Sequence, residues 1–231
     1  MHGFGERLLT KPNERDETIG RQTESRLPPA AAVIAALALY VLLPPHLTLG
    51  PPWLMPVLVL ALLVPLVVVG PMRLGQPPRV WRTVGIMVIA LVNAANVASL
   101  ALLVRTLLAP GNKETGWGLL VSATAIWLTN MLVFGLWFWE LDGGGPYSRL
   151  SASRRHADFQ FPQMVTPSCA PVGWRPSFID YLYLAFTNST AFSPADTMPL
   201  TGWAKALMAV EALISLLTVL LVAARAVGIL T

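Results

Sequence analysis

The residues of this sequence that could do chemistry are polar side chains set inside long apolar stretches. Glu211 is the only acidic residue between Leu200 and Gly228. A run of mostly polar residues precedes it: Asn188, Ser189, Thr190, Ala191, Phe192 and Ser193. The acidic residue Asp196 follows this run, and three further amide side chains lie in earlier apolar stretches: Asn93, Asn96 and Asn130. A charged or amide side chain at membrane depth is costly and normally faces a partner, a cavity or an ion path. The run 188–193, Asp196 and Glu211 are therefore the candidate pore or ion-path positions, and the three asparagines are intramembrane polar residues.

Each candidate has a structural interpretation beside the functional one. Glu211 can be a protonated, hydrogen-bonded packing residue or a cation or proton site. The three asparagines can join neighbouring helices or line a path for solute or water. The run 187–193 can be a tight external turn that satisfies its own backbone, or a hydroxyl-lined constriction with Asp196 attracting cations at its mouth.

The composition excludes an ordinary soluble enzyme. The chain has 231 residues, of which 55% are hydrophobic and 12% charged, whereas a soluble domain carries about 25% charged residues. No Asp, Glu, Lys or Arg occurs in 30–72, 83–104 or 115–139. These stretches have membrane-spanning lengths, so the lipid bilayer is the first expected partner.

Other classes of function find little support in the sequence. The single cysteine, Cys169, and three scattered histidines form no metal-ligand spacing and no nucleophile–base set. The net charge of +4 is too small and dispersed for nucleic-acid binding. We therefore expect no catalytic residues, no metal, no cofactor and no nucleic-acid partner.

The apolar stretches predict an all-α, polytopic membrane protein with about six transmembrane helices. The expected spans are 29–43, 52–70, 80–108, 116–139, 177–193 and 200–228. Five spans plus a re-entrant pore helix at 177–193 is the alternative. The expected organisation is a disordered cytoplasmic tail (1–28), a four-helix region (29–139), a polar loop (140–176) and a C-terminal helical hairpin or pore-loop-like unit (177–231).

Basic residues predict the orientation, because Lys and Arg accumulate on the cytoplasmic side. Twelve of the 16 lie in the tail, in the turn 71–82 and in the loop 140–176. Arg225, near the C-terminus, should also be inside, which requires 177–193 to cross. The predicted location is the inner (plasma) membrane, multi-pass, with both termini cytoplasmic.

A helix–bend–helix pattern begins at Phe178, where FIDYLYLAFTNSTAFSPADTMPLTGW precedes a long apolar stretch. It resembles the pore helix, filter and inner helix of bacterial tetrameric potassium channels. The resemblance places 178–187 on the pore helix, 189–193 on the filter and 205–228, with Glu211, on the inner helix. Both filter glycines are replaced, by Ala191 and Ser193, so a carbonyl-lined potassium filter is not expected.

A second resemblance covers the chain from about Trp127 to its end. It is to a family of uncharacterised bacterial inner-membrane proteins that is defined only as a domain of unknown function. The matching features are the aromatics 137–139, the glycines 143–145, the pair Asp158-Phe159, the segment 178–183, the bend 193–196 and the apolar helix 206–230. The family has no assigned reaction or ligand.

The charge pattern and the channel resemblance predict opposite orientations. A re-entrant pore loop enters and leaves on the outer face, which after four spans would put the twelve basic residues outside. The charges favour a crossing helix at 177–193. The functional expectation is a channel-like or transporter-like protein for a small cation, compatible with a homo-oligomer; the alternative is a membrane scaffold or assembly partner without a ligand.

Overall fold

The computed structural model describes residues 27–68, 79–109, 115–150, 156–191 and 196–230. The predicted tail lies almost wholly outside these ranges. The helices are α2 (Leu27–Val41), α3 (Leu54–Val68), α4 (Arg79–Leu108), α5 (Gly116–Leu141), α6 (Pro146–Leu150), α7 (Pro162–Val165), α8 (Phe178–Ala191) and α9 (Gly202–Leu230). Three 3-10 turns (Pro45–Leu47, Asp142–Gly144, Pro167–Cys169) and two strands, β1 (Phe159–Gln160) and β2 (Met198–Pro199), complete the described elements.

Three of the described helices are long and apolar enough to cross a membrane. They are Val80–Leu108, Gly116–Gly144 and Gly202–Ala224. Leu27–Val41 and Leu54–Val64 are shorter apolar helices. The predominantly helical fold is therefore confirmed, and the three apolar helices are compatible with a membrane protein. The count of about six spans is not confirmed.

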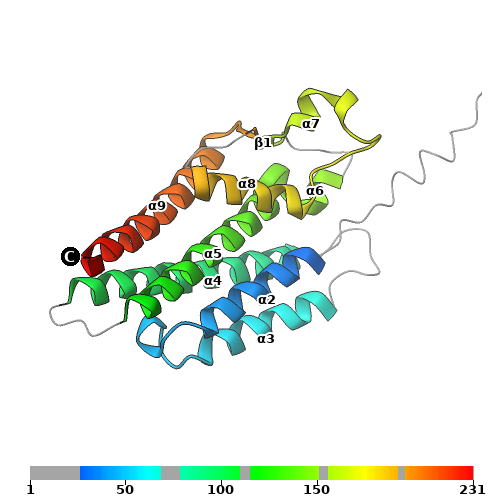
Figure 1. The fold of residues 1–231 in the computed structure, drawn as a ribbon. Helices are drawn as coiled ribbons and strands as arrows, with labels where there is room; N and C mark the ends of the chain where they lie inside the picture. Colours follow the sequence, from blue (N-terminus) through cyan, green and yellow to red (C-terminus); the bar gives the residue numbers. More distant parts are fainter. Residues whose placement is uncertain (1–26, 69–78, 110–114, 151–155, 192–195, 231) are drawn as a thin grey trace, which may run out of the picture.

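The helix α5 is the centre of the bundle. It contacts α2, α4, α8 and α9, so that the other long helices surround it (Figure 1). One apolar cluster includes Phe134 and Phe138 of α5 with Tyr181 of α8. A second, at the opposite end of α5, includes Ile126 with Leu103 of α4. Because both clusters use α5, the packing of this helix fixes the position of its neighbours.

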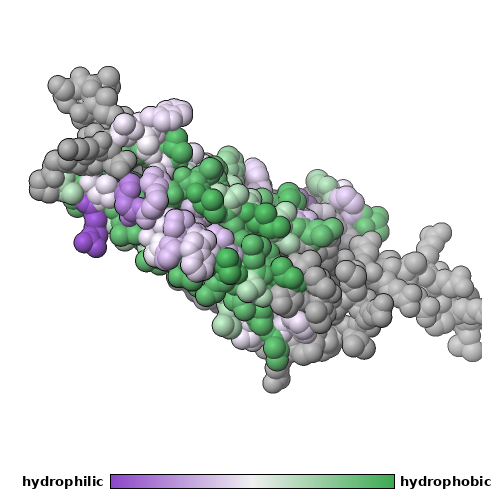
Figure 2. Space-filling model, turned by 90° about the horizontal axis from the view of Figure 1, so that it is seen from below, coloured by the Kyte–Doolittle hydropathy of each residue, from purple (hydrophilic) through white to green (hydrophobic). Residues whose placement is uncertain are grey.

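The helix α9 has its polar residues inside and its apolar residues outside. Glu211 and Ser215 are 0% exposed, whereas Leu213 and Leu220 are 65% and 55% exposed. Figure 2 shows a largely apolar middle on one face of the molecule, with the strongest hydrophilic colours toward one end. Such an inverted helix is expected where the outer solvent is lipid.

The helix α8 does not run the full length of the bundle. The first turns of α8 and α9 lie at the same end, because the ring of Phe159 contacts both Tyr181 and Trp203 at 6.4 and 6.2 Å. The other end of α8 reaches the middle of α9, where Ser189 binds Glu211. The helix α8 therefore runs from one end of the bundle toward its interior. The helix α9 begins again at the end from which α8 started.

This return puts the two outermost described helix ends at opposite ends of the bundle. Pro29 and Ala30, at the start of α2, line a cavity with Glu140 at the end of α5. Leu221 and Val222 of α9 pack on the cluster at the other end. The prediction that both termini share the cytoplasmic side stays a prediction, because the structure contains no membrane and both chain ends lie outside the described residues.

The segment 140–176 is more ordered than the predicted polar loop. It contains α6, β1, α7 and a 3-10 turn. β1 pairs antiparallel with β2, with Phe159 opposite Pro199 and Gln160 opposite Met198. This two-residue pair is a small departure from the all-α prediction, and it ties the segment to the start of α9.

Candidate functional site

The position of α8 is set by local sequence at its start. Ser177 lies before the first helical residue, and its backbone N–H donates to Asp180 Oδ2 at 2.7 Å while its hydroxyl donates to the same oxygen at 2.8 Å. A carboxylate at this position reaches back to the N-terminal backbone as in a capping box, and its charge suits the positive end of the helix dipole. The helix therefore begins at Phe178, next to the end of α5.

Glu211 lies at the meeting point of α8 and α9. Its Oε2 accepts a hydrogen bond from Asn188 Nδ2 at 2.7 Å, and its Oε1 accepts one from Ser189 Oγ at 2.9 Å. Asn188 Nδ2 also donates to the carbonyl of Met208 at 2.9 Å. Three of the predicted site residues are therefore brought together in one buried cluster.

Asn130 extends this cluster to α5. Its Nδ2 donates to Ser215 Oγ at 3.0 Å and to the backbone carbonyl of Glu211 at 3.3 Å. We call Asn130, Asn188, Ser189, Glu211 and Ser215 the three-helix cluster. All of its members are at most 2% exposed. The cluster joins α5, α8 and α9 within the bundle.

Asn93 and Asn96 of α4 lack the interhelical hydrogen bonds expected of packing residues. Among the described residues, Asn93 Oδ1, Asn96 Nδ2 and Ser99 Oγ have no hydrogen-bond partner, and the same holds for Asn130 Oδ1. Asn93 lies 15 residues before the end of α4 and Asn130 lies 14 after the start of α5. The end of α4 and the start of α5 follow each other in the chain. At 1.5 Å per residue, Asn93 and Asn130 lie about 21–23 Å from these two ends, and hence at a similar height along the two helices.

The remaining predicted site residues are at the end of α8 and after it. Thr190, Ala191 and Asp196 are exposed. Thr190 Oγ1 donates to the carbonyls of Phe186 and Thr187 at 2.8 and 3.2 Å. Phe192 and Ser193 lie outside the described residues. The bend therefore divides into a buried part, which binds Glu211, and an exposed part.

A second cluster lies at the end of α5. Asp142 is 0% exposed. Its Oδ1 accepts the backbone N–H groups of Asp158 and Phe159 at 2.6 and 3.2 Å, and its Oδ2 accepts the hydroxyl of Tyr181 at 2.5 Å. One carboxylate therefore joins α5, β1 and α8.

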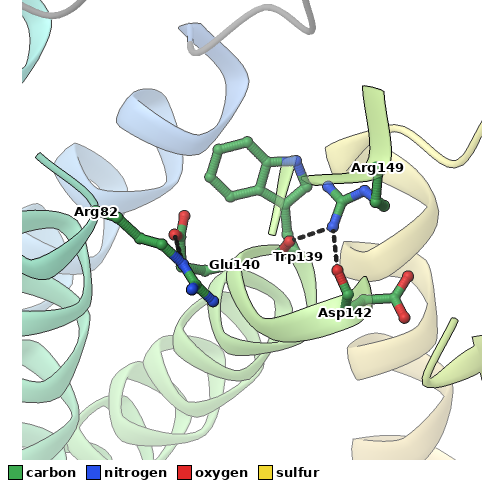
Figure 3. A network of polar contacts seen from close by, with 5 residues as sticks. All are labelled: Arg82, Trp139, Glu140, Asp142 and Arg149. Carbon is green, nitrogen blue, oxygen red and sulfur yellow. Dashed lines mark hydrogen bonds and ion pairs between the residues drawn. The ribbon is translucent and has the colours of Figure 1, made fainter. Parts of the chain in front are cut away.

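Asp158 joins the same place to α9. Its Oδ2 accepts the backbone N–H of Gly143 at 2.9 Å, and its Oδ1 accepts Thr201 Oγ1 and Trp203 Nε1 at 2.9 and 2.8 Å. Arg149 adds a cation, since one of its terminal nitrogens donates to the carbonyls of Trp139 and Asp142 at 2.7 and 3.0 Å (Figure 3). We call Asp142, Arg149, Asp158, Tyr181, Thr201 and Trp203 the polar junction.

Sequence reasoning missed the polar junction. The helix α5 ends at Leu141, and the residues on either side of this end, Glu140 and Asp142, are only 8% and 0% exposed. The only signal was the resemblance to the family of unknown function, whose features include Asp158 and Tyr181. Ser215 was also missed, although it lies one turn after Glu211 on the same face.

The three long apolar helices, with polar residues buried and apolar residues exposed, are compatible with a helical membrane protein. No family model, curated protein or solved structure matches this chain. Within the described residues, no group of three His, Cys, Asp or Glu side chains could hold a metal ion. The chemistry open to the site is therefore that of neutral amides, hydroxyls and one buried carboxylate.

Proposed function

We propose that this chain is a channel-like or transporter-like protein of the plasma membrane that passes a small cation. In this proposal α2, α3, α4, α5 and α9 cross the bilayer, and α8 is a re-entrant helix. The observation that carries it is the course of α8, which enters beside Phe159, reaches Glu211 and ends there. Glu211 is nine residues into α9, hence about 14 Å along the axis from its start.

A helix that ends at membrane depth leaves backbone carbonyls that need hydrogen-bond partners, and water can supply them. The last four carbonyls of any helix have no partner within the helix. The hydroxyl of Thr190 bonds the carbonyls of Phe186 and Thr187, which precede these four, and Thr190 and Ala191 are exposed. Irregular backbone at this depth is tolerated only where it is buried in protein or lines a water-filled cavity. The end of α8 therefore supports an aqueous path.

The charge at this place favours a cation. The C-terminal end of a helix carries partial negative charge, and half-helix ends of this kind coordinate Na⁺ or H⁺ in transporters. Glu211 lies beside this end, and Asp196 is exposed after it. In the described part of the chain, no Lys or Arg side chain contacts the three-helix cluster. An anion would find no counter-charge there.

The amides of α4 and α5 support a path that continues through the bundle. Asn93 Oδ1, Asn96 Nδ2 and Asn130 Oδ1 have no partner among the described residues. An unpaired buried polar group costs about 1–3 kcal/mol, so water or a hydrated ion between α4 and α5 would stabilise all three. A scaffold whose amides only join helices would satisfy them directly.

The exposed end of α8 also supports a homo-oligomer. Thr190 and Ala191 face away from their own bundle, and the outer face of α8 continues with Phe186 and Tyr183, which are 44% and 53% exposed. Copies arranged around an axis beside α8 would enclose these groups and the water they need. If the basic residues are cytoplasmic, α8 enters from the cytoplasmic side, opposite to the potassium channels.

The proposal is tested by ion flux in proteoliposomes that contain the full-length chain. We expect flux of Na⁺, K⁺ or H⁺ down an imposed gradient, and a decrease of at least about tenfold for Glu211→Gln. The control is Leu217→Ala, on the exposed face of the same helix, which should conduct like the original protein. Sealed vesicles without flux under all three gradients would contradict conduction and favour the scaffold.

A further inference from the structure

Two neighbouring cavities at the junction of α4 and α5 share Arg82 and Gly144. The first, about 80 Å³, lies among α2, α4 and α5 and is lined mostly by apolar side chains such as Val33 and Val88. The second, about 290 Å³, is polar and includes His156 in its wall. An apolar and a polar cavity therefore meet at one arginine.

The guanidinium group of Arg82 has N–H donors at this meeting point that are available to a ligand. Its Nε lies 3.5 Å from Glu140 Oε1, and its side chain is 42% exposed. Figure 3 shows Arg82 reaching from α4 to the end of α5, with its terminal nitrogens directed away from Glu140. No hydrogen bond or ion pair joins these nitrogens to another of the described residues. The guanidinium fork matches the oxygens of a phosphate, to which it can donate two parallel hydrogen bonds.

The carboxylates near Arg82 are already engaged. Glu140 pairs with Arg82 and is 10% exposed in its side chain. Asp158, in the wall of the polar cavity, accepts hydrogen bonds from Gly143, Thr201 and Trp203. Neither is free to take a cationic ligand, and the groups left for a ligand are Arg82 and the exposed imidazole of His156.

The aromatic residues at this end of the bundle fit the level of lipid headgroups. Trp81, Trp139 and Tyr147 all line the apolar cavity. Tryptophan and tyrosine are enriched at the boundary between hydrocarbon and water, because their rings are amphipathic. A ligand in the two cavities would therefore have its polar part at headgroup depth and its apolar part toward the hydrocarbon.

We propose that the two cavities bind one membrane phospholipid, with its phosphate at Arg82 and part of one acyl chain among α2, α4 and α5. The apolar cavity is far smaller than the roughly 300–1,000 Å³ of a typical small-molecule pocket. It holds only a piece of a ligand, whose remainder lies in the bilayer. This site does not depend on conduction, since it shares no residue with the three-helix cluster.

The first test compares three probes on the purified full-length chain in detergent. Dioleoyl phosphatidylglycerol has phosphate and chains, dioleoylglycerol has chains only, and glycerol 3-phosphate has phosphate only. At a lipid concentration about 100-fold above the Kd, we expect phosphatidylglycerol to raise Tm by roughly 5–10 °C. Each of the other two should raise it by less than half as much. An equal rise with dioleoylglycerol or with glycerol 3-phosphate would overturn the proposal.

The second test uses substitutions at the two parts of the site, with the Tm of each variant measured against its own lipid-free value. Arg82→Gln removes the fork, and Gly85→Leu fills the apolar cavity from α4. Both should lose at least half of the rise with phosphatidylglycerol. The matched controls on the same helix are Arg105→Gln and Ala90→Leu, both at exposed positions, which should keep it.

The use of both Arg82→Gln and Gly85→Leu keeps the proposal testable if one of these variants fails to fold. Arg82→Gln breaks the contact with Glu140 and can lower expression, whereas Gly85→Leu replaces a helical glycine by a better helix former. If Gly85→Leu keeps the full rise in Tm, or if Arg82→Gln responds like Arg105→Gln, the site is not where we place it.

Discussion

The three-helix cluster and the polar junction are both buried, but they are built from different partners. In the three-helix cluster, neutral amide and hydroxyl groups from α5 and α8 converge on Glu211 and Ser215 of α9. In the polar junction, two carboxylates accept backbone N–H groups as well as side chains, over separations of up to 45 residues. The first cluster fastens helices to one another, and the second fixes a loop and two helix starts to the end of α5.

This difference predicts different contributions to stability. Interhelical hydrogen bonds within membranes contribute only about 0.6 kcal/mol each on average, because the unfolded helices also find partners in the membrane. Backbone N–H groups stranded in a buried, irregular segment have no such substitute and cost roughly 1–3 kcal/mol each. We therefore expect the polar junction to matter more for folding, and the three-helix cluster to matter more for the proposed cation flux.

The largest effect is expected at Asp142. Asp142→Ala strands three buried donors, from Asp158, Phe159 and Tyr181, and should lower the free energy of unfolding by about 3–5 kcal/mol. Asp142→Asn keeps one acceptor and can donate to the tyrosine oxygen, so it should lose less. Equilibrium unfolding in mixed detergent micelles measures both. Asp196→Ala, at an exposed carboxylate, is the control, and an equal loss there would refute the special role of the junction.

A smaller effect is expected at Gly145, which closes the turn beside the junction. Its φ is +98°, and a Cβ there would lie 2.9 Å from the carbonyl oxygen of Glu140. Gly145→Ala should therefore cost about 2–3 kcal/mol, from strained backbone and a contact that cannot relax. Gly173 also has a positive φ, +75°, but an added Cβ meets nothing within 4 Å. Gly173→Ala should cost only about 1 kcal/mol.

The same unfolding measurement separates strain from contact. Similar losses at the two glycines would mean that backbone angle alone matters, and that the approach of Gly145 to Glu140 is not tight in solution. A larger loss at Gly145 would show that the end of α5 is packed closely against the turn.

The third effect is at Glu211. Glu211→Ala removes the acceptor for Asn188 and Ser189 and should cost about 1–2 kcal/mol, at roughly 0.6 kcal/mol for each bond plus a small cavity. Glu211→Gln keeps an acceptor for Asn188, and its amide can donate to the serine oxygen, so it should stay within about 0.5 kcal/mol. A loss as large as that of Asp142→Ala would remove the distinction between the two clusters.

Much of the fold could be predicted from the sequence, because the length of an uncharged apolar stretch directly indicates a long helix. The expected spans 80–108 and 116–139 agree with α4 and α5 to within two residues at each end. The sequence also singled out Asn130, Asn188 and Glu211, because polar residues are rare at membrane depth and have to be explained. The same reasoning could not find Asp142 or Asp158, since carboxylates near helix ends are common and mostly solvated.

The course of α8 could not be settled from its own residues. Its 14 residues are enough for about 21 Å of helix, which is compatible with a thin crossing or with a helix that goes in and stops. The outcome depends on where the chain goes next, and that is fixed by contacts of Thr201 and Trp203 with Asp158. These contacts join parts of the chain more than 40 residues apart, beyond the reach of periodicity or charge counting.

The smallest effect on stability is expected at the exposed end of α8, where the effect on flux should be large. The hydroxyl of Thr190 bonds only carbonyls of its own helix, so Thr190→Val should change the free energy of unfolding by less than about 0.5 kcal/mol. If this hydroxyl faces the proposed cation path, the same substitution should lower ion flux severalfold, because it removes an oxygen from the end of α8. Thr106→Val is the matched control, since its hydroxyl also bonds a carbonyl one turn back, on α4. Equal flux in both variants would separate α8 from conduction and leave its role to packing alone.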